Sequence, residues 1–226
     1  MSRYIILSSK KWNVKLLDNL KQKHSNIEWL LIHDQNQFQY ENIRSLNPDK
    51  IFIPHWSYII PDTIFDNFEC ILFHMTDLPF GRGGSPLQNL IVRGYKNTMI
   101  SAIKVEEGLD TGDIYIKKDL SLLGTAEEIF LRATDTIGEM ISEIITKNIK
   151  PVPQIGESEV FKRRKPSDGD ISQLKSVEEV FDYIRMLDAE GYPNAYLETE
   201  FFKFEFSRAS LKSGEKLIAD VRITKK

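Results

Sequence analysis

The sequence predicts an α/β fold: a mostly parallel, twisted sheet with helices on both faces, followed by a small mixed C-terminal annex. Strand-like runs alternate with helical segments in the first half, and a long helix is expected over residues 125–148. Near residue 150 the composition changes, where Pro151-Val152-Pro153 ends the helical region. The length of 226 residues fits one large domain plus an annex. We therefore expect a domain at residues 1–150 and a linker, helix and small β-rich annex at 151–226.

The first half of the chain contains four short apolar runs: Tyr4–Ser8, Ile27–Ile32, Lys50–Pro54 and Glu69–His74. Between the first two runs, residues 12–23 carry large apolar side chains at helical spacing: Trp12, Leu16, Leu17 and Leu20. Strands separated by helical segments form βαβ units, whose strands pair in parallel and whose helices cover the sheet. This alternation predicts a Rossmann-like arrangement.

The second half of the chain adds a helix, two strands and the annex. Helix 125–148 can begin with a capping box, because Glu128 stands three residues after Thr125. The other expected elements are a helix over 87–93, strands over 98–105 and 113–120, a helix over 177–187, and short strands between 195 and 224.

The charge balance of the sequence argues against nucleic-acid binding. With 30 basic and 33 acidic residues, the formal net charge is −3. A protein that binds a long polyanion by counterion release needs an excess of basic residues, which this chain lacks. We therefore expect no nucleic-acid partner. No apolar stretch approaches the ~20 residues of a membrane span, and the N-terminus lacks a secretory signal. We expect a soluble, cytoplasmic protein with no membrane partner.

The single cysteine, Cys70, excludes an internal disulfide framework and a multi-cysteine zinc site. Cys70 lies in an apolar run, and we interpret it as a buried strand residue. No pair of the four histidines has the spacing of a metal site, so no metal is expected.

The loop Phe80–Pro86 is rich in glycine. It lacks the Gly-Lys-Ser/Thr ending of a P-loop, and no Gly-x-Gly-x-x-Gly follows the first strand. A dinucleotide or nucleotide-triphosphate loop is therefore not indicated. The loop is either a flexible connection or a place where the backbone approaches a ligand closely.

Two titratable residues are candidates for catalysis. His74 stands at the carboxyl end of the run Ile71-Leu72-Phe73, where open α/β sheets bind their ligands. Asp110 lies in a glycine-containing turn between two expected strands. On spacing alone, His74 can equally be a structural histidine and Asp110 a turn residue. If Asp110 reached His74, it would favour the imidazolium form and give the pair acid/base competence.

Two motifs resemble those of a known family. The first is Leu72-Phe73-His74-Met75-Thr76-Asp77-Leu78-Pro79, followed by Gly81-Arg82-Gly83-Gly84-Ser85-Pro86, and the second is Leu109-Asp110-Thr111-Gly112. They resemble the Asn-x-His-x-Ser-Leu-Leu-Pro and Leu-Asp-x-Gly motifs of the 10-formyltetrahydrofolate-dependent formyltransferases. The separation of 110 − 74 = 36 residues matches that family. Further similarity extends the resemblance over about residues 50 to 195.

The resemblance implies a formyltransferase catalytic domain at 1–150, with 10-formyltetrahydrofolate as co-substrate, no metal, and His74 and Asp110 as catalytic residues. It places Trp56, Tyr58, Ile59, Ile60 and the backbone near Leu109 around the pterin. We expect the acceptor near Lys10, Trp12, Arg82 and Gly83, although the lysines at 10 and 11 can equally be a solvated helix start.

One position departs from the family pattern. The motif asparagine, which lies two residues before the histidine, is Leu72 here. Leucine cannot donate a hydrogen bond to an oxyanion, and loss of one such donor typically costs about a hundred- to a thousandfold in rate. Either another side chain supplies the donor, with His55, Gln88 and Asn89 as the candidates, or the activity is weak or lost.

The acceptor is inferred by exclusion. Methionyl-tRNA formyltransferases carry a larger C-terminal domain, and the net charge of −3 argues against tRNA. The short annex is more like that of sugar N-formyltransferases. The sequence therefore predicts formylation of a nucleotide-linked 4-amino-4,6-dideoxy sugar in surface-glycan or nonulosonic (pseudaminic-type) acid biosynthesis, by a homodimer. A catalytically degenerate folate- or sugar-binding protein and a 10-formyltetrahydrofolate deformylase are the alternatives.

Overall fold

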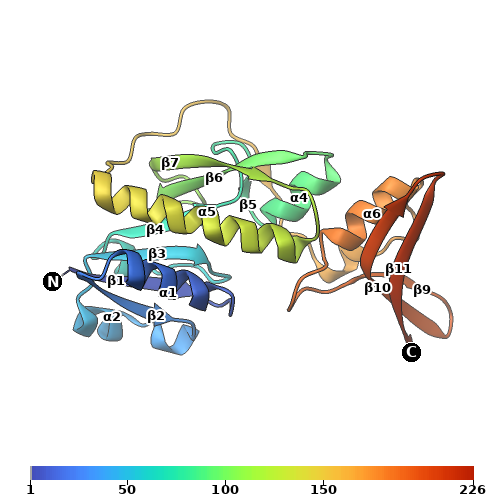
Figure 1. Cartoon of the computed structure of the whole chain (residues 1–226), viewed down its shortest axis with the longest axis horizontal. Coiled ribbons are helices and arrows are strands. Elements are labelled where there is room, and N and C mark those ends of the chain that lie inside the picture. Colours follow the sequence, from blue (N-terminus) through green and yellow to red (C-terminus); the bar gives the residue numbers. More distant parts are fainter. Residues whose placement is uncertain (1) are drawn as a thin grey trace. The chain divides into compact units, whose positions relative to one another are not determined.

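The structure, a computed structural model, describes residues 2–226 and divides into two compact units (Figure 1). Each unit is assembled from segments that are distant in sequence. The first contains the chain up to Gly83 with residues Thr98–Leu120 and Leu131–Val160. The second contains residues Gly84–Asn97, Ser121–Phe130 and Phe161–Lys226.

The first unit is built on a sheet that, within residues 2–226, has six strands in the spatial order β2-β1-β3-β4-β6-β7. Strands β1, β2, β3 and β4 pair in parallel, and β4 pairs antiparallel with β6. The strand bounds are β1 Ser2–Ser8, β2 Ile27–Ile32, β3 Lys50–His55, β4 Cys70–His74, β6 Asn97–Lys104 and β7 Ile114–Ser121. The prediction of a mostly parallel sheet is confirmed.

One face of the sheet is covered by two short helices, α2 (Tyr40–Leu46) and α3 (Asp62–Phe65). Ile43 of α2 and Ile64 of α3 are fully buried in one apolar cluster with alternate residues of the strands. The other buried members of the cluster are Ile5, Leu7, Ile32, Phe38, Ile51, Ile53 and Cys70. Because side chains alternate along a strand, residues such as Ile6 and Phe52 project from the opposite face.

On the opposite face, helix α1 (Asn13–Lys23) packs against α5 (Ala126–Lys147). Two buried polar contacts join these helices within the first unit. Thr134 donates a hydrogen bond to Asn13 (3.1 Å), and His24 lies 3.0 Å from the Ser142 hydroxyl. A side chain larger than hydrogen at Gly138 would meet Leu16 at 2.9 Å, so glycine permits the close approach. Helices therefore cover both faces, as predicted.

The second unit contains a three-stranded antiparallel sheet in the order β11-β10-β9, with bounds β9 Ala195–Glu198, β10 Phe202–Lys212 and β11 Lys216–Lys225. Helix α6 (Val177–Arg185) lies against this sheet and contacts α4 (Pro86–Val92) (Figure 1). Buried Arg185 donates to the carbonyls of Leu122 and Gly124 and pairs with Asp182. The predicted small annex with a helix and a β-rich part is confirmed.

Some elements are absent from the sequence prediction. Helices α2 and α3 have seven and four residues, too short for a helical period to stand out in a polar stretch. The two-residue strands β5 (Arg82–Gly83) and β8 (Val160–Phe161) pair across a long sequence distance. The 3-10 turns η1 (Gln35–Gln37) and η2 (Pro166–Gly169) complete the list. Such short elements form because tertiary contacts fix them.

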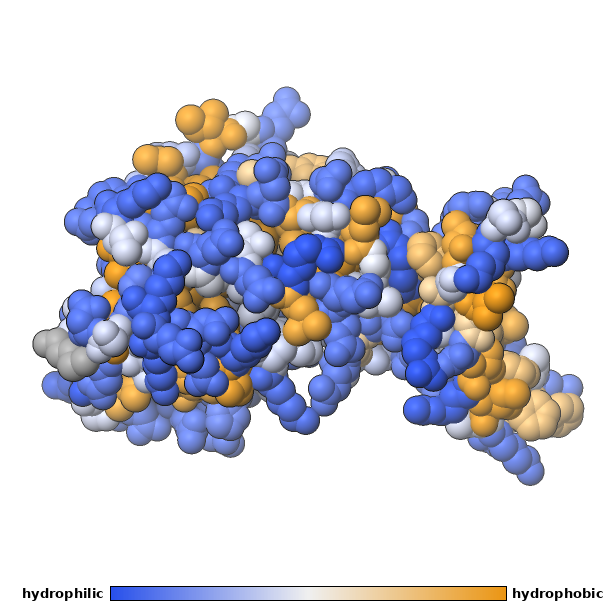
Figure 2. All heavy atoms as spheres, in the orientation of Figure 1, coloured by the Kyte–Doolittle hydropathy of each residue, from blue (hydrophilic) through white to orange (hydrophobic). Residues whose placement is uncertain are grey.

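Cys70 is a buried residue of β4, as interpreted from the sequence. Burial raises the pKa of its thiol to about 12. The space-filling view shows a largely hydrophilic surface with apolar side chains on the C-terminal sheet, where Ile218, Val221 and Ile223 are exposed (Figure 2). Within residues 2–226, no helix has the length and apolarity that a bilayer crossing requires.

We predict that Gly112→Ala destabilises the first unit. A Cβ atom at Gly112 would lie 1.8 Å from the carbonyl oxygen of Lys104, and backbone cannot move aside as a flexible side chain can. The free energy of unfolding should fall by at least ~2 kcal/mol, measured by urea denaturation. Gly94→Ala is the control, because its Cβ meets nothing within 4 Å and only its positive φ adds cost. Equal losses in the two variants would contradict the steric explanation.

Candidate active site

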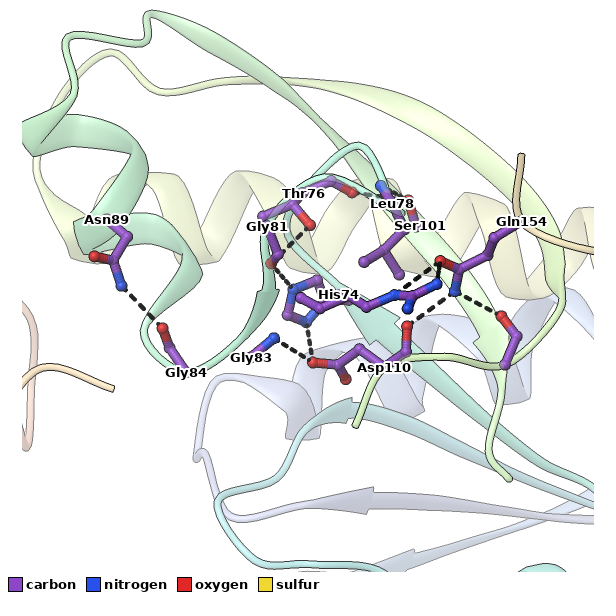
Figure 3. A network of polar contacts seen from close by, with 12 residues as sticks. His74, Thr76, Leu78, Gly81, Gly83, Gly84, Asn89, Ser101, Asp110 and Gln154 are labelled. Atoms are coloured by element: carbon purple, nitrogen blue, oxygen red, sulfur yellow. Dashed lines mark hydrogen bonds and ion pairs between the residues drawn. The ribbon is translucent and has the colours of Figure 1, made fainter. Parts of the chain in front are cut away.

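His74 is the last residue of β4, at the carboxyl end of the parallel strands. Its side chain is 7% exposed, and its Nε2 atom lies 2.8 Å from the carbonyl oxygen of Gly81. A carbonyl oxygen only accepts, so Nε2 carries the hydrogen of this bond. In the neutral ring Nδ1 is then an acceptor. Figure 3 shows this nitrogen directed at the carboxylate of Asp110.

Asp110 comes from the turn between β6 and β7 and has a left-handed backbone, with φ of 54°. This conformation is tolerated by aspartate better than by most residues. Its Oδ2 atom lies 3.6 Å from Nδ1 of His74 and accepts a hydrogen bond of 2.8 Å from the Gly83 amide. Both side chains are 7% exposed, so the carboxylate faces the histidine in a partly desolvated place.

The loop after His74 is held in place by side chains from β6 and β7. Ser101 donates to the carbonyl of Thr76 (2.7 Å) and accepts from the Leu78 amide (3.3 Å). Lys117 reaches the Asp77 carboxylate and the Leu78 carbonyl, at 2.5 Å each. These contacts fix the position of Gly81, and with it the orientation of the His74 ring.

The arrangement can hold and move a proton. Each ring nitrogen of a histidine can carry a proton, and a carboxylate beside one of them can accept it. Such a pair can act in acid/base chemistry and can stabilise a developing oxyanion. The structure thus brings together the two residues that the motifs singled out, while their catalytic roles stay a prediction.

The three candidate donors for the role of the missing asparagine differ in what they contact. Gln88 donates its amide to the Met186 carbonyl. The Asn89 amide faces three carbonyl oxygens, of Gly84, Ser85 and Lys162. Both amides therefore hold backbone in the second unit.

His55 has a different setting. His55 is the last residue of β3, which pairs in parallel with β4, and it pairs with Ser8 of β1 after a shift in register. Its ring lies edge-on to Trp12, with centroids 6.0 Å apart. Burial, reinforced by the Lys10 ammonium, lowers the pKa of His55 from 6.5 to about 4. A neutral His55 can still donate one hydrogen bond.

Leu72 packs beside the apolar cluster under α2 and α3. It follows the alternation of β4, in which Cys70, Leu72 and His74 share one face. The position that the family motif fills with an amide is therefore apolar in this fold.

The residues expected around the pterin follow β3 or lie in the Asp110 turn. Tyr58, Ile59 and Leu109 are exposed, Ile59 by 92%. Trp56 packs against Tyr58, with ring centroids 5.2 Å apart, and Ile60 is half-buried beside the apolar cluster. The Trp56 Nε1 atom is buried and finds no hydrogen-bond partner within residues 2–226. This donor is suited to a carbonyl or amide group of a heterocycle.

The residues expected near the acceptor are engaged within the first unit. The Lys10 ammonium lies 5.3 Å from the centre of the Trp12 ring. Arg82 donates twice to Gln154, at 3.2 and 2.7 Å, and the Gly83 amide binds Asp110. Their contact with an acceptor stays a prediction. Within the described residues, no group of three or more His, Cys, Asp and Glu side chains could hold a metal ion.

Sequence reasoning missed Gln154 and Ser101. Ser101 lies inside β6 and Gln154 in an irregular segment after α5, and neither belongs to a motif. The only local signal was the proline pair at 151 and 153, which indicated a fixed backbone but no contact.

Comparisons with known proteins cover most of the chain. Residues 18–145 match the model of a family described as formyl transferase. Residues 166–224 match the model of the methionyl-tRNA formyltransferase C-terminal domain. The methionyl-tRNA formyltransferase of Campylobacter curvus is 30% identical over 183 residues, which are 76% of this chain. The chain spans 59% of the length of that relative.

Solved structures show the same relationship. The methionyl-tRNA formyltransferase structure from Clostridium thermocellum is 52% identical, with a TM-score of 0.97 and 100% coverage of both chains. A sugar N-formyltransferase from a Shewanella species has a TM-score of 0.67 at 15% identity, covering 97% of this chain and 96% of its own. The second likeness is one of fold alone.

These findings correct the expected acceptor. Three predictions are wrong: an amino-sugar acceptor, a nucleotide-sugar and polysaccharide pathway, and the absence of a nucleic-acid partner. The relatives that are similar in sequence are methionyl-tRNA formyltransferases. The size argument failed because the short segment 166–224 itself matches the C-terminal domain of those enzymes. The charge argument failed because a sum over the chain hides local clusters.

We predict that His55 makes stability depend on pH. Its pKa is 6.5 when unfolded and about 4 when folded, so between these values the unfolded chain binds the extra proton. The free energy of unfolding should fall by about 1–3 kcal/mol as pH decreases from 6.5 toward 4. Urea denaturation across this range should show a smaller loss for His55→Gln, with exposed His33→Gln as control. An unchanged pH dependence in His55→Gln would refute the assignment.

Proposed function

The chain belongs to the formyl transferase family, and on that premise we propose that it formylates the α-amino group of methionyl-tRNA, with 10-formyltetrahydrofolate as donor. The observation that carries the proposal is the His74–Asp110 pair, enclosed by Gly81 and Gly83, in a chain with both family segments. The substrate class implies a cytoplasmic reaction.

The reaction is an amide exchange. The lone pair of the acceptor amine forms a bond to the formyl carbon and gives a tetrahedral intermediate with an oxyanion. The bond from this carbon to N10 of the folate then breaks. The proton lost by the amine ends on N10, so tetrahydrofolate leaves and the acceptor becomes a formamide.

His74 and Asp110 have different roles in this reaction. Protonated His74 stabilises the oxyanion through the positive charge of its ring, since Nε2 is bonded to Gly81 and Nδ1 faces Asp110 at 3.6 Å. As the intermediate collapses, Asp110 can collect the amine proton, directly or through water. The pterin borders Trp56, whose buried Nε1 donor is available to it.

His55 supplies the donor that Leu72 does not. It ends the strand adjacent to that of His74, and its lowered pKa keeps it neutral at pH 7, so it donates without competing for the charge. The amides of Gln88 and Asn89 are already bound to carbonyl oxygens.

A basic run supports a polyanionic acceptor. Residues Lys162-Arg163-Arg164-Lys165 follow β8 at the start of the second unit's C-terminal segment. Lys162, Arg163 and Lys165 are exposed and form no ion pair within residues 2–226. Unpaired arginine and lysine side chains are the usual partners of backbone phosphates. A local cluster of this kind is compatible with a net charge of −3.

The proposed activity is tested with purified chain, 10-formyltetrahydrofolate and methionyl-tRNA, measuring formylmethionyl-tRNA by mass. We expect turnover that depends on the acceptor and falls by about a hundredfold or more in His74→Gln and in Asp110→Asn. Formate release that is independent of the amine would indicate a hydrolase and contradict the proposal. Folate binding without turnover would also contradict it.

We predict that His55→Phe lowers kcat by about a hundredfold, because phenylalanine has no donor for the oxyanion. His55→Gln keeps a donor and should retain most of the activity. In the His55→Phe background, Leu72→Asn should restore part of kcat by returning an amide to β4, although removing Leu72 from the cluster costs stability. A wild-type kcat in His55→Phe would contradict the role of His55 as the hydrogen-bond donor to the oxyanion.

A further inference from the structure

We propose that Gln154 is a positioning residue for the His74–Asp110 pair, an inference that rests on the proposed function. Gln154 is half-buried in an otherwise exposed segment between α5 and β8, and its neighbour Ile155 is 91% exposed. Figure 3 shows the Gln154 amide turned inward, toward the turn that carries Asp110. The side chain is therefore directed at the candidate active site and away from solvent.

The Gln154 amide makes every hydrogen bond of which it is capable. Its Oε1 atom accepts from Nε and Nη2 of Arg82, at 3.2 and 2.7 Å. Its Nε2 atom donates to the carbonyl oxygens of Asp110 (2.9 Å) and Gly112 (2.8 Å). A guanidinium only donates and carbonyl oxygens only accept, so the partners fix which end of the amide faces which side.

These four bonds join the two segments that hold His74. Arg82 lies between Gly81, whose carbonyl binds Nε2 of His74, and Gly83, whose amide binds the Asp110 carboxylate. Asp110 and its turn lie on the Nδ1 side of the ring. Gln154 therefore sets the distance between the groups on the two sides of the imidazole.

Gln154 is not needed to tether its own segment. Val152 and Ile114 exchange two backbone hydrogen bonds, of 2.8 and 2.9 Å, and Glu159 accepts from the Arg82 amide at 2.9 Å. The segment is thus anchored by backbone on both sides of Gln154. The amide is left to act on the turn, where Asp110 has φ of 54° and Gly108 has φ of 99°.

The chemistry explains why glutamine suits the position. A glutamate would still bind Arg82, but its second oxygen would face the carbonyls of Asp110 and Gly112 without a hydrogen to share. A methionine would fill the same volume and lose all four bonds. Gln154→Glu therefore removes only the hydrogen bonds to the carbonyls of Asp110 and Gly112. Gln154→Met also removes the hydrogen bonds from Arg82.

The kinetic test uses formylation of methionyl-tRNA. We expect kcat to fall about 10–100-fold in Gln154→Met and Gln154→Glu, because small displacements of a catalytic group cost this much. The KM for 10-formyltetrahydrofolate should stay within about twofold. Gln173→Met is the matched control, since Gln173 is exposed and its side chain bonds to the neighbouring Ser172 and not to the candidate site. A rise in KM with unchanged kcat would overturn the assignment.

A double-variant cycle separates positioning from general stability. If Gln154 acts through Asp110, adding Gln154→Met to Asp110→Asn should lower kcat little further. Full additivity of the two losses would overturn the proposal. The midpoint of thermal unfolding, measured for each variant, shows whether Gln154→Met folds. If it does not fold, Gln154→Glu, which keeps the Arg82 contact, is used in the cycle in its place.

A readout independent of activity is hydrogen exchange at the Gly83 amide, which donates to Asp110. Exchange should be faster in both Gln154 variants and unchanged in Gln173→Met. If wild-type protein forms no formylmethionyl-tRNA, the proposed function fails, while faster Gly83 exchange still supports Gln154 as the residue that holds Asp110. Unchanged Gly83 exchange in both Gln154 variants overturns the inference whatever the activity.

Discussion

The candidate active site depends on one backbone interaction, the antiparallel pairing of β4 with β6. This pairing sets His74 opposite Ser101 and Phe73 opposite Ala102. The loop after His74 is bound to Ser101, and the turn after β6 returns Asp110 to the histidine. The β4–β6 pairing and the turn that follows β6 together bring His74 and Asp110 close, although they are 110 − 74 = 36 positions apart.

Around this pairing, backbone groups bind both His74 and Asp110. The Gly81 carbonyl and the Gly83 amide approach the histidine and aspartate because glycine adopts the positive φ values of 76° and 101° found there. Gln154 then binds both sides of the pair with one amide. Preorganised donors and acceptors of this kind need little rearrangement when charge develops. The glycine-rich loop thus brings its backbone within hydrogen-bond distance of His74 and Asp110, while its approach to a ligand stays a prediction.

The correction of the acceptor has a physical lesson about charge. Electrostatic binding of a polyanion depends on the field at the contact surface, which falls off within about 10 Å at ordinary salt. A net charge of −3 is a sum over all 226 residues and hardly reports on the run Lys162–Lys165. The inference from chain length was wrong for a similar reason. The fifty-nine residues from 166 to 224 are enough to match the model of the methionyl-tRNA formyltransferase C-terminal domain. Sums over the chain describe the whole molecule, whereas recognition is local.

The sequence by itself determined the longer elements and the identity of the motif residues. Strands such as Ile27–Ile32 and the helix over Ala126–Lys147 follow from local hydrophobic periodicity, which is a property of neighbouring residues. Helices α2 and α3, the β5–β8 pair and the contacts of Gln154 could not be predicted in this way. They depend on partners distant in sequence, so only the tertiary structure decided them. The same holds for His55, which ends the strand next to that of His74 because β3 pairs with β4.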